Sequence, residues 1–225
     1  KLSSSLFLKN LDHLNYKKNF SKIPKLIKSK MIKASMLKIK NRLSGNISAK
    51  EGMDYMSKTS FYKNYHKKNR LLKNTANIKI LVSTHDFFDS VHAFGDLIFP
   101  DFYEWMIHIG KLSNITEHDW YVKTHPSYKG KFGINQIFSK KIVNEIITKF
   151  PRLKILPNNV SHLRLIKEGI DYVITCFGNV GIEYPNFDIP VICCCKKNPF
   201  VNYNFNIHPK SKKEFDKIIF NLKKN

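Results

Sequence analysis

The apolar positions divide the chain into two parts with different patterns. From residue 77 onward, short apolar runs rich in β-branched residues alternate with stretches in which apolar residues recur every three or four positions. The first pattern is typical of buried strands and the second of helices that cover a sheet. We therefore predict strands within residues 78–84, 120–125, 153–156, 171–175 and 189–195, and helices within residues 99–113, 134–150, 161–168 and 211–224.

This alternation predicts the fold class. Strand and helix alternate about five times in roughly 150 residues, and the strands are nearly all apolar. Strands of this kind are covered on both faces, which favours an α/β fold with a doubly wound, mainly parallel, Rossmann-like sheet. Ligands of such sheets bind at the carboxyl ends of the strands. The polar residues that follow each predicted strand are therefore the candidates for a site.

The first 75 residues lack this alternation and carry most of the charge. They hold 19 Lys and Arg against three acidic residues, in a chain whose formal net charge is +22. Apolar residues at mixed helical spacings between the lysines of residues 22–43 predict a basic amphipathic helix, of a kind that lies on anionic membranes. A genome biased toward Lys, Asn and Ile codons, or a helix leading out of an upstream domain, explains the same pattern.

Two segments follow from this change of pattern. We expect residues 1–75 to be a basic, mostly helical or linker segment, the remnant of an N-terminal domain, and residues 76–225 to be the Rossmann-like domain. The chain begins with Lys1 rather than Met, which is typical of a fragment or a trimmed chain. It contains no apolar run of about 18 residues, so no membrane-spanning helix is expected.

The four cysteines exclude two common kinds of site. Three of them are consecutive, Cys193 to Cys195, and the fourth is Cys176. This spacing suits neither a disulfide framework nor a zinc site. We expect reduced, buried cysteines in a cytosolic protein, with no metal and no cofactor.

The first candidate cluster ends the strand predicted at residues 120–125. Pro126 disfavours a helical conformation at His125 and keeps the backbone there extended, so the imidazole leaves the strand at its end. Lys123, two residues earlier, lies on the same side of the strand and adds positive charge. We predict that Lys123 and His125 bind a phosphate and that His125 is also a candidate acid. A loop histidine without a function is the alternative.

The second cluster is the turn "TCFGNVGIEYP", which begins at Thr175. Gly178 and Gly181 permit a tight turn and close approach to a ligand, and a helix that starts near Asn179 directs N–H groups at an anion. Glu183 is a candidate acceptor for the two hydroxyls of a ribose. The turn is neither a dinucleotide fingerprint nor a Walker loop. The alternative is a structural turn in which Glu183 only complements the helix dipole.

The third cluster is "STHDFFDSVH", residues 83–92. Its histidines and acids lie close together, but their spacing is unconvincing for zinc and no cysteine accompanies them. His85 and Asp89 are candidates for a general base or for a group that positions an acceptor. A solvated loop with capping acids is the alternative.

Together these motifs resemble the nucleotide-binding half of the GT-B glycosyltransferases. The resemblance is carried by a strand ending in K-x-H-P, by "LPNNVSHLRLIKEGIDYVIT" and by "GNVGIEYPNFDIPVI", and it covers about residues 77–225. Within that fold the chain most closely resembles the bacterial capsule polysaccharide synthesis proteins of the Kdo-transferase-like group, which share a His-Pro motif with bacterial sialyltransferases.

The resemblance implies roles for individual residues. The family's His-Pro motif, which contacts the donor phosphate, maps onto His125 and Pro126. The family's small-residue turn, commonly Gly-Ser/Thr-x-Gly-x-Glu, maps onto Gly178, Asn179, Gly181 and Glu183. Asn179 replaces the usual hydroxyl residue. The catalytic base of GT-B enzymes often comes from the other domain, most of which this chain lacks.

The resemblance therefore implies a glycosyltransferase, or its donor-binding half, in bacterial surface or capsular polysaccharide biosynthesis. The implied partners are a CMP-, CDP- or UDP-linked sugar and a polysaccharide or lipid-linked acceptor. The basic segment adds an anionic membrane surface as a further candidate partner. We expect a cytoplasmic protein, peripheral on the inner face of the membrane. The sugar, the linkage and the stereochemistry of transfer are not predicted by the sequence.

Two other interpretations stay open. A CDP-polyol phosphotransferase of the teichoic-acid type uses a similar half-fold with paired histidines, and the identity of the donor separates it from a sugar transferase. A nucleic-acid-binding protein is favoured by the basic segment and by Phe61, Tyr62 and Tyr65 among its lysines. Nucleic-acid binding leaves the polar clusters at the strand ends without a role, so we rank it last.

Overall fold

The computed structural model describes residues 15–44, 69–88, 96–125, 133–157 and 160–224. Its centre is a six-stranded sheet in the order β3-β2-β1-β4-β5-β6, and every neighbouring pair is parallel. The strands are β1 (Lys79–Ser83), β2 (Asp119–Lys123), β3 (Leu153–Ile155), β4 (Tyr172–Thr175), β5 (Val191–Cys193) and β6 (Asn206–Ile207). The predicted doubly wound, parallel α/β fold is confirmed.

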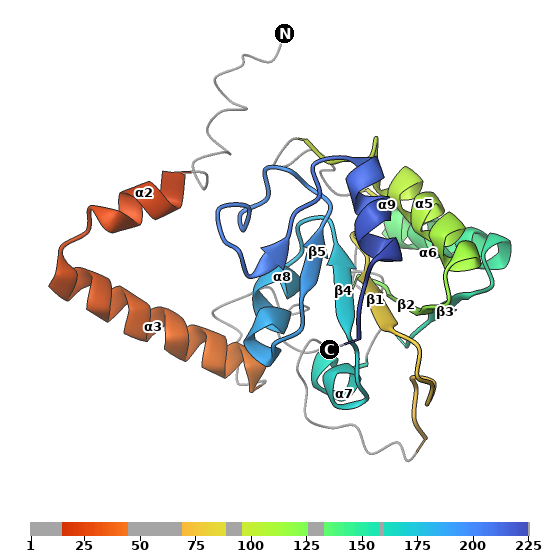
Figure 1. Cartoon of the computed structure of the whole chain (residues 1–225), viewed down its shortest axis with the longest axis horizontal. Helices are drawn as coiled ribbons and strands as arrows, with labels where there is room; N and C mark the ends of the chain where they lie inside the picture. The colour runs from red at the N-terminus through yellow and green to blue at the C-terminus, as the bar shows by residue number, and fades with distance from the viewer. Residues whose placement is uncertain (1–14, 45–68, 89–95, 126–132, 158–159, 225) are drawn as a thin grey trace, which may run out of the picture.

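Helices cover both faces of the sheet, as the apolar strands require (Figure 1). One face packs against α5 (Phe102–Ile115), α6 (Gly133–Lys149) and α9 (Lys212–Phe220). The other packs against α7 (His162–Lys167), α8 (Val180–Glu183) and the 3-10 helix η3 (Tyr184–Phe187). Side chains alternate between the two cores along each strand, so that Ile80 and Val82 face the first core and Leu81 faces the second.

Local chemistry fixes where two of these helices begin. The Asp101 carboxylate accepts a hydrogen bond from the Glu104 N–H at 2.7 Å and caps α5. The Ser211 hydroxyl accepts one from the Glu214 N–H at 3.2 Å and caps α9. Such caps satisfy N–H groups that have no partner inside the helix.

The N-terminal segment contains two helices, α2 (Tyr16–Ser21) and α3 (Lys25–Leu43), and neither buries a residue. In Figure 1, α3 extends away from the α/β body and approaches it at its C-terminal end, beside α8. The basic helix is confirmed, but its predicted amphipathic character is wrong. Its exposed apolar residues come in pairs five positions apart, and each step of five turns by about 140° around a helix. They therefore encircle α3: Leu26, Ile27, Met31, Ile32, Met36 and Leu37.

The chain joins the α/β body before β1. Leu72 is buried in the second core, and the Glu168 carboxylate accepts hydrogen bonds from the N–H groups of Leu71 and Leu72 at 2.8 and 2.9 Å. The boundary between residues 75 and 76 stays a prediction. Among the described helices, none has the length and apolar character needed to cross a membrane.

Candidate functional site

The strand order reverses between β1 and β4, because the chain builds outward from β1 through β2 to β3 and then returns to the other side of β1. Ligands of open parallel sheets bind in the crevice beyond the strand ends at such a point. A cavity of about 190 Å³, here called the switch-point cavity, lies there. Its lining is Arg42, Ser83, Thr84, His85, His125, His162, Thr175, Phe177, Gly178, Asn179, Val180 and Glu183.

All three sequence clusters contribute to this cavity. His85 follows β1, His125 follows β2, and Gly178, Asn179 and Glu183 follow β4. Lys123 is buried at the end of β2, close enough to Glu183 for their charges to interact. Gly181 lies outside the lining, and Asp89 and Pro126 lie outside the described residues.

His85 is built into the turn after β4. Its Nε2 accepts hydrogen bonds from the N–H groups of Cys176 and Phe177, both at 3.3 Å, and lies 3.2 Å from the Thr175 hydroxyl. An imidazole nitrogen that accepts bonds from two N–H groups is unprotonated. His85 therefore holds the turn through the nitrogen that a general base would need.

The surroundings of the His85 ring keep it neutral. The ring stacks on Phe102 with centroids 4.7 Å apart and an interplanar angle of 10°. Burial, and secondly the charge of His125, lower the pKa of His85 to about 3. This environment favours a positioning role, and the predicted catalytic role of His85 stays a prediction.

The two glycines of the turn have different tasks. The Gly178 N–H donates to the Thr175 hydroxyl at 3.2 Å, and a Cβ at Gly178 would lie 2.8 Å from that same oxygen. Gly178 therefore permits the close approach that the turn requires. At Gly181 a Cβ would lie 2.7 Å from the Phe200 ring. Gly181 thus permits packing against Phe200, and its predicted phosphate contact is not seen in the lining of the cavity.

The helix start expected after Gly178 is present but short. Asn179 occupies the N-cap position of α8, and its side chain makes no capping bond. Because α8 has four residues before it continues into η3, its dipole is small compared with that of a full helix. Attraction for an anion must come mainly from charged side chains.

Glu183 lies at the centre of a buried charge network that the sequence did not reveal. Its side chain is 5% exposed and accepts a short, charged hydrogen bond from Nε of Arg42, at the end of α3. Burial raises the pKa of Glu183, against the opposing effects of Arg42 and Lys123. Burial lowers the pKa of Lys123 to about 8, against the opposing effect of Glu183. The carboxylate predicted to bind ribose is thus engaged by a cation.

His162 is a second residue that the sequence did not reveal. Its Nδ1 lies 2.7 Å from the Tyr184 hydroxyl, and both side chains are buried. Burial, followed by the charges of Lys123 and Arg42, lowers the pKa of His162 well below its usual range. A signal was available, because a helix that follows a strand in such a fold begins at the carboxyl edge of the sheet, and His162 is the first residue of α7.

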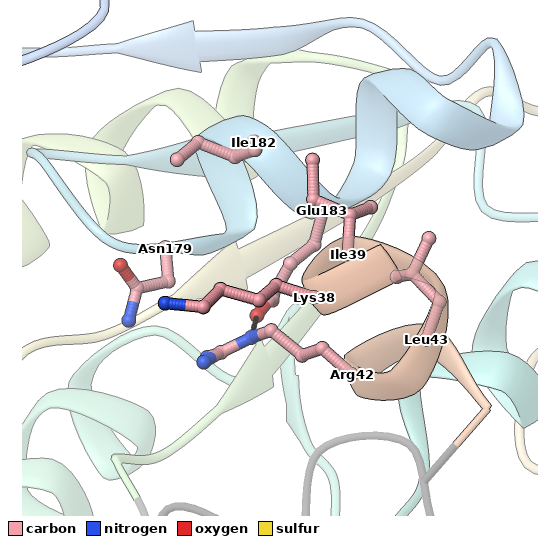
Figure 2. Close-up of a pocket in the computed structure, with 7 residues that line it drawn as sticks. All are labelled: Lys38, Ile39, Arg42, Leu43, Asn179, Ile182 and Glu183. Carbon is pink, nitrogen blue, oxygen red and sulfur yellow. Dashed lines mark hydrogen bonds and ion pairs between the residues drawn. The ribbon is translucent and has the colours of Figure 1, made fainter. Parts of the chain in front are cut away.

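A second cavity of about 220 Å³, here called the α3–α8 cavity, adjoins the first (Figure 2). Arg42, Asn179 and Glu183 line both cavities, so the ion pair forms part of the wall of each. The remaining lining of the α3–α8 cavity is Lys38, Ile39, Leu43 and Ile182.

The chemistry of these groups suits an anion. Arg42 and Lys123 both act on the buried carboxylate of Glu183, His125 lines the same cavity, and burial strengthens each electrostatic contact. In the described part of the chain, no group of three or more His, Cys, Asp or Glu side chains is placed to hold a metal ion. All four cysteines are free and buried.

Comparisons with known proteins give one structural match. No protein-family model and no curated protein matches the sequence. The crystal structure of Methanocaldococcus jannaschii UDP-GlcNAc 2-epimerase in complex with UDP-GlcNAc and UDP aligns with a TM-score of 0.45 and 16% sequence identity. The match covers 83% of this chain and 46% of the epimerase chain, so the present chain spans less than half of that protein.

Proposed function

We propose that this chain is the donor-binding part of a glycosyltransferase that takes a sugar from a nucleotide-activated donor. The observation that carries the proposal is that His125 and the Gly178–Asn179 turn line one cavity at the point where the strand order reverses, with Lys123 buried at the end of the same strand that leads to His125. A phosphate in the switch-point cavity would be adjacent to both β2 and β4.

Each residue has a task in this proposal. His125 donates a hydrogen bond to the donor phosphate, and the buried Lys123 ammonium at the end of β2 adds positive charge nearby. Together they stabilise the negative charge that develops on the departing nucleotide, an effect worth about 2.7–4 kcal/mol per well-placed donor in comparable sites. Gly178 leaves space for the phosphate, and His85 positions the turn that carries it.

The predicted role of Glu183 is narrower than the sequence suggested, and the predicted roles of Pro126 and Asp89 stay untested. Glu183 can accept from a ribose only through the part of its carboxylate that Arg42 does not hold. Pro126 as the partner of His125, and Asp89 as a residue on the acceptor side, stay predictions from the sequence because both lie outside the described residues.

The proposed biological setting is bacterial surface or capsular polysaccharide synthesis in the cytoplasm, with a polysaccharide or lipid-linked acceptor. The motifs around His125 and Gly178 support this setting through their resemblance to capsule synthesis proteins. α3 supports association with an anionic membrane, because it carries seven Lys and Arg, no acidic residue, and exposed apolar side chains.

A CDP-polyol phosphotransferase is the second candidate. The observation that favours it is the presence of three histidines, His85, His125 and His162, around one cavity. His85 and His162 are buried, and each is engaged by a neighbouring group of the protein. This arrangement leaves His125 as the histidine best placed to meet a donor.

A nucleotide panel tests the proposal. The melting temperature of the full chain is measured with CMP, CDP, UDP and GDP, and a nucleotide present at about 100 times its Kd should stabilise the fold by about 2.7 kcal/mol. The corresponding nucleotide-sugar and CDP-glycerol are then compared for release of the nucleotide in the presence of acceptor. Release from the sugar donor supports the proposal, and release from CDP-glycerol alone supports the second candidate. Absence of stabilisation by all four nucleotides contradicts both.

A further inference from the structure

We infer that α3 supplies a second anion subsite, formed by Lys38, Arg42 and Asn179, and that the ligand carries two adjacent phosphate groups, one in each cavity. This inference rests on the proposed function and narrows the donor to the nucleoside diphosphate class. It also makes the N-terminal segment a part of the binding site.

The first observation is the direction of the donor groups. Figure 2 shows the terminal nitrogens of Arg42, the ammonium of Lys38 and the amide of Asn179 pointing toward the same side of the α3–α8 cavity. Arg42 uses Nε for Glu183, and a guanidinium has four further N–H donors on its terminal nitrogens. These donors can bind an anion while the ion pair stays intact.

The second observation explains how the guanidinium is held in place. The Glu183 side chain is 5% exposed, whereas that of Arg42 is 32% exposed. A buried carboxylate is stable only when it is paired, so Glu183 holds Nε of Arg42 in place. The terminal nitrogens on the other edge of the guanidinium then face the cavity. Arginine is well suited to this task because its planar fork matches the oxygens of a phosphate.

The third observation is the balance of charge. The two adjoining cavities are lined by Lys38, Arg42 and His125, and Glu183 is the carboxylate that lines both. Lys123, buried at the end of β2, adds its charge to that of Arg42 at Glu183. The positive charge thus exceeds what one phosphodiester neutralises. Ile39, Leu43 and Ile182 form the apolar part of the wall.

The test compares mono- and diphosphates of the same nucleosides. Calorimetry at one ionic strength gives the affinities of the full chain for CMP and CDP, UMP and UDP, and GMP and GDP. The variants are Lys38→Ala and Arg42→Lys, and the matched control is Lys40→Ala. Lys38 and Lys40 are both exposed, and Lys40 lies about 200° further around the helix, so the two substitutions remove the same charge from different faces.

The wild type should bind the diphosphate of the preferred nucleoside about tenfold more tightly than its monophosphate. Lys38→Ala should reduce this preference several-fold and leave monophosphate binding nearly unchanged, because Lys38 lines only the α3–α8 cavity, and Lys40→Ala should behave like the wild type. Arg42→Lys should also reduce the preference, and it should weaken monophosphate binding as well, because Arg42 lines both cavities. Arg42→Lys keeps a cation beside Glu183, and a thermal melt confirms that the variant is folded.

Two results overturn the inference and differ in what they say about the proposed function. If CMP, UMP or GMP binds as tightly as its diphosphate, or if Lys38→Ala has no larger effect than Lys40→Ala, the second subsite is wrong while donor binding stands. If the wild type binds none of the six nucleotides, the proposed function fails as well.

Discussion

At the carboxyl end of β4, a few side chains fix the shape of the site. Thr175 and His85 hold the backbone of the turn, and Gly178 is required because any Cβ there would collide with the Thr175 hydroxyl. The sequence predicted that these positions belong to one site. It did not predict that His85 holds the turn in place by accepting hydrogen bonds from its backbone N–H groups. Hydrogen bonds between residues 90 or more positions apart leave no pattern in the sequence.

Gly181 gives a prediction at the residue scale. Gly181→Ala places a Cβ about 2.7 Å from Phe200, and this overpacking should outweigh the better helix propensity of alanine. We expect a net loss of about 1–2 kcal/mol in the free energy of unfolding, measured by urea denaturation. The double variant Gly181→Ala/Phe200→Leu should recover part of the loss. Unchanged stability, or weaker nucleotide binding by the folded variant, would favour a ligand contact at Gly181 instead.

His85 gives a prediction about pH. Burial lowers its pKa to about 3 in the folded protein, against 6.5 in the unfolded chain, so the unfolded chain binds more protons between these values. Stability should therefore fall as the pH decreases from 6.5 toward 3, and His85 should contribute no pH dependence above pH 7. In His85→Gln, whose amide oxygen can still accept from the turn, the slope should be shallower by up to about 1.4 kcal/mol per pH unit.

The measurement is urea unfolding of wild type and His85→Gln at several pH values in this window. Because the other titrating groups are common to both proteins, the difference between the two curves isolates residue 85. Parallel curves would show that His85 is not buried in neutral form.

At the scale of elements, the predicted strands and helices formed where the apolar patterns were strong. The five predicted strands became β1 to β5, and β6 was missed because two residues are too few to show a pattern. The amphipathic character predicted for α3 is wrong, because its apolar pairs recur every five positions, and a helix places residues five apart on different faces. Residues at helical spacing over part of a segment do not make a continuous apolar face.

The proposed membrane contact of α3 is tested with vesicles. Lysines on a helix with exposed apolar side chains should bind anionic lipid, with roughly 1 kcal/mol contributed by each cation near the surface. The full chain should co-sediment with vesicles that contain phosphatidylglycerol and much less with vesicles of phosphatidylcholine alone. Lys30→Glu/Lys33→Glu should abolish this difference, since both side chains are exposed and lie outside both cavities. Equal binding to the two vesicle types would contradict the proposal.

At the scale of the whole molecule, the position of the site follows from the topology of the sheet. Once the strands were known to be parallel, the carboxyl edge was predictable, and His125 and Gly178 were found there. Arg42 was not predictable, because it reaches Glu183 across 141 positions and belongs to a helix outside the sheet. The sequence is therefore informative about sites that a fold creates and much less so about contacts that a separate segment adds.

We propose above all that His125 binds the donor phosphate at the carboxyl end of β2. The most direct test is calorimetry of the stabilising nucleotide with wild type, His125→Ala and His118→Ala. His118 precedes the opposite end of the same strand and lies outside the switch-point cavity, which makes it a matched control. If His125 binds the phosphate, His125→Ala should weaken binding by about tenfold or more and His118→Ala should change it by less than about twofold. Equal affinities of the two variants would contradict it.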